Sequence, residues 1–163
     1  MTKVLFSDPI DQAGIDILGQ VAQVDQRTGL SADELKSIIG DYDALMIRSG
    51  TQVTADVIAA ADRLRIIGRA GVGVDNVDVP AATQRGVLVV NSPEGNTIAA
   101  AEHALALLLS LSRHVPQAHG SMRAGAWDRK KYVGNELYKK VLGVVGLGKI
   151  GSHVAKVAKA MGM

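Results

Sequence analysis

The chain has 163 residues, of which 47% are hydrophobic and 21% are charged, so it can bury a core and lacks the composition of a disordered protein. Eighteen Lys and Arg against 16 Asp and Glu give a formal net charge of +2. Because these basic residues are scattered along the chain, the charge argues against a nucleic-acid-binding protein. The absence of cysteine excludes disulfides, thiolate nucleophiles, iron–sulfur clusters and cysteine-ligated zinc.

Targeting and membrane segments are not apparent in the sequence. Residues 1–11 carry one Lys and a short apolar run, unlike a secretory signal or an Arg-rich transit peptide. The most apolar stretch, 98–111, contains Glu102 and His103 and is too short for a hydrocarbon core of about 30 Å. We therefore expect a cytoplasmic protein with no membrane partner, in which this stretch is a buried helix.

The first half of the chain alternates short aliphatic runs with helical patterns, which indicates βαβ units, a parallel sheet and an α/β fold. Strands are predicted at 3–7, 21–24, 44–47, 65–68 and 87–90. Helices are predicted between them at 11–19, 31–40, after Thr54, and at 81–84. The second of these helices begins with a capping box, since Ser31 is followed three residues later by Glu34.

The pattern changes at Asn96, which is a helix N-cap followed by a run that is apolar on nearly every side. Such a run predicts a helix that is buried all round. Pro116 is expected to end this helix, and residues 119–135 are expected to form a loop that leads to a strand at 141–145. We place a domain boundary here, which gives domains 1–95 and 96–163.

The clearest motif lies near the carboxyl terminus, where the predicted strand 141–145 meets Gly146-Leu147-Gly148-Lys149-Ile150-Gly151 and a predicted helix, 150–161. In a strand–turn–helix, the first glycine allows a tight turn, the second lets backbone approach a pyrophosphate, and the third permits close packing of helix on strand. The amides and dipole at the helix amino terminus then favour an anion. The motif predicts a dinucleotide site, the alternative being a simple packing turn.

The second half of this fingerprint is an acidic residue about 20 positions after the glycines, which holds the ribose and separates NAD from NADP. The chain ends before that position, and Gly162 stands where a helix C-cap belongs. We therefore expect the chain to be the amino-terminal part of a longer protein.

A set of motifs, taken together and in this order, resembles the D-isomer-specific 2-hydroxyacid dehydrogenases. They are RAGVGVDNVD at 69–78, NSPEGN at 91–96, AEH at 101–103, WDRKK at 127–131 and GLGKIG at 146–151. The resemblance runs along the whole chain and covers about the first half of the family's catalytic core. It implies a flavodoxin-like substrate domain followed by the truncated start of a Rossmann nucleotide-binding domain, with the active site in the cleft between the two.

The resemblance also implies an NAD-dependent oxidoreductase that forms homodimers or homotetramers at full length. The family's catalytic Arg, Glu and His follow later in its sequences, so we assign no catalytic residue here. His103, His114, His119 and His153 share no metal-ligand spacing, and no metal site is expected. Nor does any Ser lie in a nucleophile elbow.

Within the family, the resemblance implies oxidation of 3-phosphoglycerate to 3-phosphohydroxypyruvate, the entry step of serine synthesis. Arg48 and Ser49 follow a buried strand at its carboxyl end, where ligands bind in open α/β sheets, and are candidates for the phosphate. The alternative for Arg48 is a bond to loop carbonyls or a surface ion pair. Backbone amides of Gly73 and Val74 are candidates for the carboxylate, although this segment could be only a tight turn.

The resemblance assigns cofactor contacts to Val72, to Lys149 and Ile150, and to the three motif glycines Gly146, Gly148 and Gly151. Some relatives have Thr at the position of Val72, so a contact there is expected to be main-chain or apolar. Arg129 and Lys131 belong to a basic cluster that reaches a substrate anion of the neighbouring subunit in similar enzymes. The alternative is a solvated charge run beside Trp127.

Two other functions remain open at this point. A relative acting on glyoxylate or hydroxypyruvate would need no second anion subsite. A dinucleotide-sensing module, similar to the co-repressors of this family, would bind the cofactor without turning over a hydroxyacid.

Overall fold

The computed structural model describes all residues, 1–163, which divide into two compact units, Met1–Gly95 and Asn96–Met163. Each unit is described by itself. None of the helices is long and apolar enough to cross a membrane. The assignment of the units as substrate and nucleotide domains stays a prediction.

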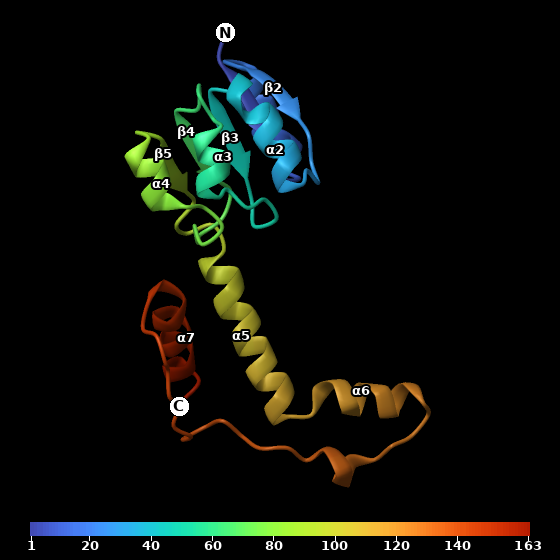
Figure 1. Cartoon of the computed structure of the whole chain (residues 1–163). Helices are drawn as coiled ribbons and strands as arrows, with labels where there is room; N and C mark the ends of the chain where they lie inside the picture. The colour runs from blue at the N-terminus through green and yellow to red at the C-terminus, as the bar shows by residue number, and fades with distance from the viewer. The chain divides into compact units, whose positions relative to one another are not determined.

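The first unit is built on a five-stranded, wholly parallel sheet with the strand order β2-β1-β3-β4-β5 (Figure 1). The strands are β1 (Lys3–Phe6), β2 (Gln23–Gln26), β3 (Ala44–Ile47), β4 (Ile66–Arg69) and β5 (Leu88–Asn91). This is the flavodoxin-like order, in which the direction of winding reverses between β1 and β3. The predicted α/β class and flavodoxin-like sheet are confirmed.

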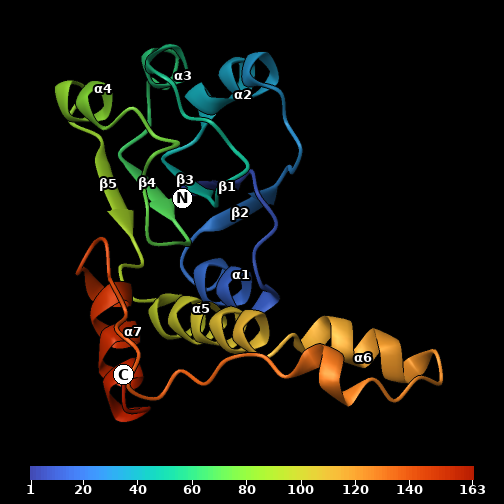
Figure 2. The ribbon, with the colours of Figure 1, turned by 90° about the horizontal axis from the view of Figure 1, so that it is seen from below.

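Helices cover both faces of this sheet, as parallel strands require. They are α1 (Gln12–Gly19), α2 (Ala32–Ile38), α3 (Ala55–Ala59) and α4 (Val79–Gln84), with a 3₁₀ turn, η1 (Ile39–Asp41), after α2. Figure 2 shows α2, α3 and α4 on one face and α1 on the other. The larger core cluster, which includes Leu35, Leu45 and Ile67, underlies the three helices, while Ile15 of α1 packs with Val4 and Phe6.

The capping box at the start of α2 is confirmed. The Ser31 hydroxyl accepts a hydrogen bond from the Glu34 amide at 3.3 Å, and the Glu34 carboxylate accepts one from the Ser31 amide at 2.8 Å. The hydrogen bonds from the Ser31 backbone and side chain lower the pKa of Glu34 below its ordinary value. Thr54 likewise caps α3, because its hydroxyl accepts from the Val57 amide.

The second strand lies two residues later than predicted. The prediction places it at 21–24, whereas pairing with β1 joins Lys3 to Gln23 and Phe6 to Gln26. Val21, which suggests the earlier start, is instead exposed in the turn after α1. Strand pairing with a neighbour far away in sequence, and not local hydropathy, therefore sets the boundary.

The second unit consists of helices and irregular segments. Its elements are α5 (Thr97–Ser112), α6 (Val115–Arg123), the 3₁₀ turn η2 (Arg129–Tyr132) and α7 (Lys149–Ala160). Helix α7 packs against α5 and ends at Ala160. Met161 is its C-cap, and Gly162, one residue after the position predicted for the end of the helix, has the left-handed φ of +84° that is common just beyond a helix. Within the described chain α5 buries Ala101 and Leu105 and leaves Leu107 and Leu111 exposed, so the expectation that it is buried all round is wrong.

The predicted loop at 119–135 is also wrong in its first part, where α6 forms. Pro116 does not simply end α5, because it lies in the first turn of α6, where a missing amide costs nothing. The break between the two helices falls at His114, whose φ of +53° is left-handed and interrupts the helical path.

The strand predicted at 141–145 is not formed. These residues have no regular structure, and Val141 and Val145 are fully exposed. A β-strand is held by hydrogen bonds to a neighbouring strand, and the second unit contains no other strand with which this segment could pair. The aliphatic run has the composition of a strand, but a strand also needs a neighbouring strand for its hydrogen bonds, and the second unit contains none.

Two leucines of the sheet provide a matched test of the core. Leu45 of β3 is fully buried, whereas Leu88 of edge strand β5 is 65% exposed. We expect Leu45→Ala to lower the free energy of unfolding by about 2 to 5 kcal/mol because it leaves a cavity. We expect Leu88→Ala to change it by about 0.5 kcal/mol or less. Urea denaturation of the chain measures both, and equal losses would contradict the described core.

Candidate functional site

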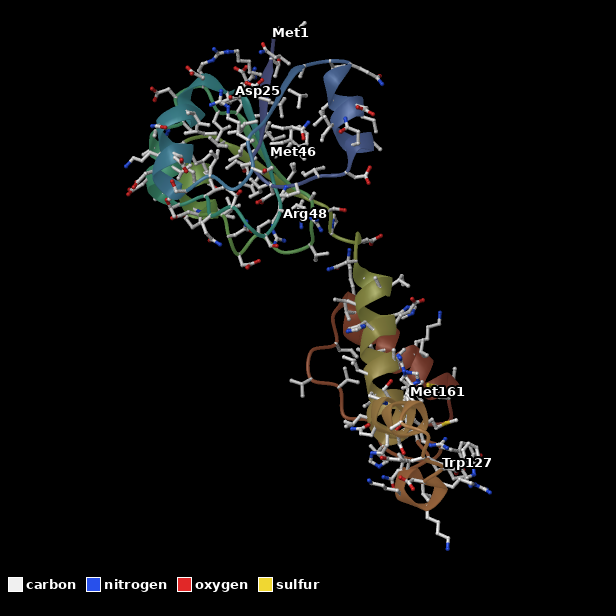
Figure 3. All side chains as sticks on the ribbon, turned by 90° about the vertical axis from the view of Figure 1, so that its right-hand side faces the viewer. Met1, Asp25, Met46, Arg48, Trp127 and Met161 are labelled. Atoms are coloured by element: carbon white, nitrogen blue, oxygen red, sulfur yellow. The ribbon has the colours of Figure 1, made fainter.

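The loops that follow β1 and β3 leave the sheet at its carboxyl edge, at the point where the strand order reverses. Ser7 and Asp8 follow β1, and Arg48 and Ser49 follow β3. In open α/β sheets, ligands bind in the crevice outside this edge at the point of reversal. Figure 3 shows Arg48 at the end of the first unit opposite to Met1. The candidate residues of the first unit therefore lie where this topology places a binding site.

Arg48 and Ser49 are exposed at this edge. The Arg48 side chain forms no hydrogen bond or ion pair within the chain, so neither of the structural alternatives, a bond to a loop carbonyl or a surface pair, is formed. By contrast, the backbone amide and the backbone carbonyl of Arg48 are both hydrogen-bonded to other loops. The guanidinium is thus a free cation on an anchored segment, which is an arrangement suited to binding an anion.

Two buried polar side chains that the sequence analysis missed hold this segment. One carboxylate oxygen of Asp8, Oδ2, accepts from the Arg48 amide at 2.6 Å and from the Thr51 amide at 3.1 Å. The Asn76 amide nitrogen Nδ2 donates to the carbonyls of Arg48 at 2.7 Å and of Thr51 at 2.6 Å. The Ser7 and Thr51 hydroxyls are also hydrogen-bonded, at 2.9 Å. Asp8 therefore holds the amides of Arg48 and Thr51, and Asn76 holds the carbonyls of the same two residues.

The loop after β4 offers backbone donors beside this turn. The amides of residues 72–76 have no acceptor within the chain, and Gly73 is exposed, while Val72 and Val74 are half-buried. The Arg69 side chain lies under the loop and donates through Nη1 to the Gly73 carbonyl, and Asn91 donates to the Val72 carbonyl. Arg69 also forms an ion pair with Asp75 of the same loop, at 3.7 Å, so its charge is already partly matched. The available amides of this loop can bind a carboxylate.

Arg69 and Asn76 also leave polar atoms unpaired. The Arg69 Nε and the Asn76 Oδ1 are buried without a hydrogen-bond partner. Because Nδ2 of Asn76 donates to two carbonyl oxygens, the orientation of this side-chain amide is fixed, and Oδ1 is the atom that stays unsatisfied. Such groups are uncommon in buried regions, and here they lie at the end of β4 and in the loop that follows it, at the carboxyl edge of the sheet.

The glycine motif of the second unit has the turn and the helix start expected of a phosphate loop, although the strand predicted before it is not formed. Gly146 has a φ of +91°, which side chains rarely tolerate. A Cβ on Gly151 would stand 2.1 Å from the Gly146 carbonyl oxygen, whereas one on Gly148 would meet nothing within 4 Å. Gly148 is the N-cap of α7 and no side chain caps that helix. The amides of Ile150 and Gly151 have no acceptor within the chain, so they are available to an anion.

The basic cluster lies in η2 and before it, in the second unit. Arg129 and Lys131 are exposed, and the Lys131 ammonium stands 5.6 Å from the centre of the Tyr132 ring. Trp127, labelled in Figure 3, is 71% exposed. The side chain of Asp128 accepts a hydrogen bond from Ser121. A contact of this cluster with a substrate anion of another subunit stays a prediction.

The four histidines do not form a metal centre. The structure contains no group of three or more His, Asp or Glu side chains placed to hold a metal ion. A hollow of about 560 Å³ in the first unit lies at the opposite, amino-terminal edge of the sheet, and none of the candidate residues lines it. Chemistry at the carboxyl edge, and not concavity alone, therefore defines the candidate site.

Comparison with known proteins gives the family. Residues 4–160 match the family described as D-isomer specific 2-hydroxyacid dehydrogenase, catalytic domain, and the chain belongs to that family. Over all 163 residues it is 67% identical to the D-3-phosphoglycerate dehydrogenase of Synechocystis, of which it covers 29%. The chain thus spans about 30% of the length of the curated relatives that it matches.

Solved structures agree in fold. The TT0316 protein of Thermus thermophilus is 33% identical, with a TM-score of 0.89 over 99% of this chain and 54% of its own. A putative D-isomer specific 2-hydroxyacid dehydrogenase from Polaromonas, described as NAD-binding, is 27% identical, with a TM-score of 0.87 over 99% of this chain and 53% of its own.

The glycines of the motif differ in how much space a side chain would have at each position. We expect Gly151→Ala to reduce helicity and thermal stability, because the new methyl group would collide with backbone at Gly146. Gly148→Ala is expected to leave both nearly unchanged, since the space around it is open. Circular dichroism and thermal unfolding of the two variants measure this difference. A Gly151→Ala variant as stable as Gly148→Ala would contradict the tight turn.

Proposed function

We propose that this chain is the amino-terminal part of an NAD-dependent D-3-phosphoglycerate dehydrogenase. The full-length enzyme oxidises 3-phospho-D-glycerate to 3-phosphohydroxypyruvate, the first step of L-serine biosynthesis, in the cytoplasm. The observation that carries the proposal is the 67% identity, over the whole chain, to a Synechocystis protein of that name. The free cation at the reversal point of the sheet is consistent with a phosphorylated substrate.

The first unit binds the two anionic ends of the substrate in this proposal. The phosphate is held by the guanidinium of Arg48 and the hydroxyl of Ser49, and the carboxylate by backbone amides at Gly73 and Val74. The exposed Arg48 side chain attracts the phosphate by its positive charge, and the directional hydrogen bonds of the loop amides orient the carboxylate. The carbon that carries the hydroxyl group then lies between the two anchors, oriented for reaction.

The second unit binds the cofactor. The amides at the start of α7 bind the pyrophosphate. Gly146 forms the turn, Gly148 leaves space for the pyrophosphate, and the missing side chain at Gly151 lets α7 approach the Gly146 carbonyl. Lys149 and Ile150 are the first two residues of α7, and Val72 contributes backbone or apolar contact. When bound, NAD accepts the hydride that leaves the substrate carbon. The relative from Polaromonas described as NAD-binding supports this choice of cofactor.

The remaining parts of the proposal concern the whole protein. The base that takes the hydroxyl proton is not among the candidate residues and is expected among the Arg, Glu and His that the family carries later in its sequence. Full-length protein is expected to form a homodimer or homotetramer. Arg129 and Lys131 would then reach the substrate anion of a neighbouring subunit.

Arg48 provides the test of the function. In the full-length protein we expect wild type to oxidise 3-phosphoglycerate in preference to D-glycerate. We expect Arg48→Ala to lower kcat/KM for 3-phosphoglycerate by about 10- to 150-fold, as loss of a charge-assisted hydrogen bond of about 1.5 to 3 kcal/mol requires. Steady-state kinetics that follow NADH absorbance measure both.

The control is Arg63→Ala, at the amino-terminal edge of the sheet, where Arg63 pairs with Asp43 at 3.0 Å. It is expected to leave kcat/KM unchanged. A wild type without preference for the phosphorylated acid would exclude 3-phosphoglycerate as the substrate and favour a glyoxylate or hydroxypyruvate reductase. Binding of NADH without turnover of any 2-hydroxyacid would favour a dinucleotide-sensing module.

Gly148 provides the test of the cofactor site. We expect Gly148→Val to weaken NADH binding by at least about tenfold, because its side chain fills space that the pyrophosphate needs, while the fold is kept. Gly143→Val is the matched control, since Gly143 also has open space around it but precedes the motif. Fluorescence titration with NADH measures the affinities. Equal affinities in the two variants would show that the dinucleotide binds elsewhere.

A further inference from the structure

Asn76 joins the two loops to which the proposed function assigns the two ends of the substrate. Its side chain donates to the carbonyls of Arg48 and Thr51, at 2.7 and 2.6 Å, in the loop after β3. Its backbone belongs to the loop after β4, because the Val77 amide donates to the Val74 carbonyl across it at 3.0 Å. One residue is therefore a strut between the phosphate segment and the carboxylate segment.

The backbone of Asn76 is itself firmly held. Its carbonyl accepts from the Val53 amide at 2.8 Å, and the Val53 carbonyl accepts from the Asp78 amide at 2.9 Å. These bonds form the isolated parallel bridge between Val53 and Val77. Asn76 is only 5% exposed, so its side-chain amide has no water to replace the two carbonyls. Hydrogen bonds therefore hold both the backbone and the side-chain amide of Asn76 in place.

Asp8 completes the attachment on the far side of the turn. Its carboxylate accepts the amides of Arg48 and Thr51, the same two residues whose carbonyls Asn76 binds. A Cβ on Gly50 would stand 2.6 Å from Oδ1 of Asp8, so the turn also closes tightly over this carboxylate. The polar groups of the turn are thus satisfied by two side chains from other loops, and the Arg48 side chain starts from a defined point.

We propose that Asn76 is a positioning residue that sets the separation between the two anion subsites and thereby determines specificity for a hydroxyacid with a second anionic group. The inference rests on the proposed function. Asn76 does not touch the substrate in this scheme. It acts through Arg48, whose guanidinium meets the distal phosphate only when the turn is held at the correct distance from the amides of Gly73 and Val74.

The substitution Asn76→Asp tests the strut with little change in shape. The carboxylate cannot donate, so it faces the carbonyls of Arg48 and Thr51 with like partial charge and releases the turn. A substrate with a distal phosphate then loses its second anchor, whereas D-glycerate, which has no such group, keeps the carboxylate loop. In the full-length protein we expect the ratio of kcat/KM for 3-phosphoglycerate to that for D-glycerate to fall at least tenfold.

Asn91→Asp is the matched control. The Asn91 side chain also donates to a backbone carbonyl, that of Val72, but it contacts only the carboxylate loop. Both substrates use that loop, so both values of kcat/KM are expected to fall together and the ratio to stay constant. For Asn76→Asp the loss on 3-phosphoglycerate is expected in KM more than in kcat, because the distal anchor binds the substrate before and during reaction alike.

The outcomes separate the inference from the function on which it rests. A wild type that does not prefer 3-phosphoglycerate defeats the proposed function. A wild type that prefers it, with an Asn76→Asp ratio equal to wild type or to Asn91→Asp, overturns the role of Asn76. If Asn76→Asp does not fold, Asn76→Ser keeps a single uncharged donor and is measured instead. The ratio is again expected to fall, and an unchanged ratio in this folded variant would also overturn the inference.

Discussion

The parallel pairing of β1 with β3, and the reversal of winding between them, is the constraint on which the first unit depends. Val4, Leu5 and Phe6 pair with Ala44, Leu45 and Met46, and each strand then ends at the same edge. Because all strands of the sheet are parallel, the loops that follow them, including those after β1, β3 and β4, leave from that edge. Ser7 and Asp8 in the loop after β1 hydrogen-bond to Arg48 and Thr51 in the loop after β3, so the two loops lie together at the edge where ligands bind in open α/β sheets. A site at this edge is thus a consequence of topology before any side chain is considered.

The same topology creates a problem of hydrogen bonding that the polar residues solve. Loops that turn back over the edge bury peptide groups that the sheet cannot satisfy, and each unsatisfied group costs about 1 to 3 kcal/mol. Asp8 accepts two amides and Asn76 donates to two carbonyls of one short turn, so four such groups are satisfied by two side chains. Breaking either contact would leave buried polar groups on both partners. That cost is what gives the turn around Arg48 a single conformation.

Local signals predict most of the first unit, since the alternation of aliphatic runs and helical patterns locates all five strands and the capping box at Ser31 locates the start of α2. The errors in β2 and at 141–145 share one cause, because strand pairing decides both and pairing partners are not visible in a local window. Arg48 and the glycine motif can likewise be found from position, since one follows a buried strand and the other precedes a helix. Asp8 and Asn76 cannot, because the Arg48 groups they bind are 40 and 28 positions away. Sequence patterns therefore show which groups can bind a ligand more readily than which groups hold them in place.

The two proposed anion sites are built by different means, and this difference bears on how each tolerates change. In the second unit the donors belong to the first turn of α7, and only the glycines at 146, 148 and 151 shape the loop. That proposed site is local in sequence, because its glycines and the first amides of α7 are close together along the chain. In the first unit the loops after β3 and β4 have no regular structure, and their separation depends on side chains from three segments. A change far from Arg48 in sequence can therefore alter what Arg48 binds, whereas the loop before α7 responds mainly to changes within itself.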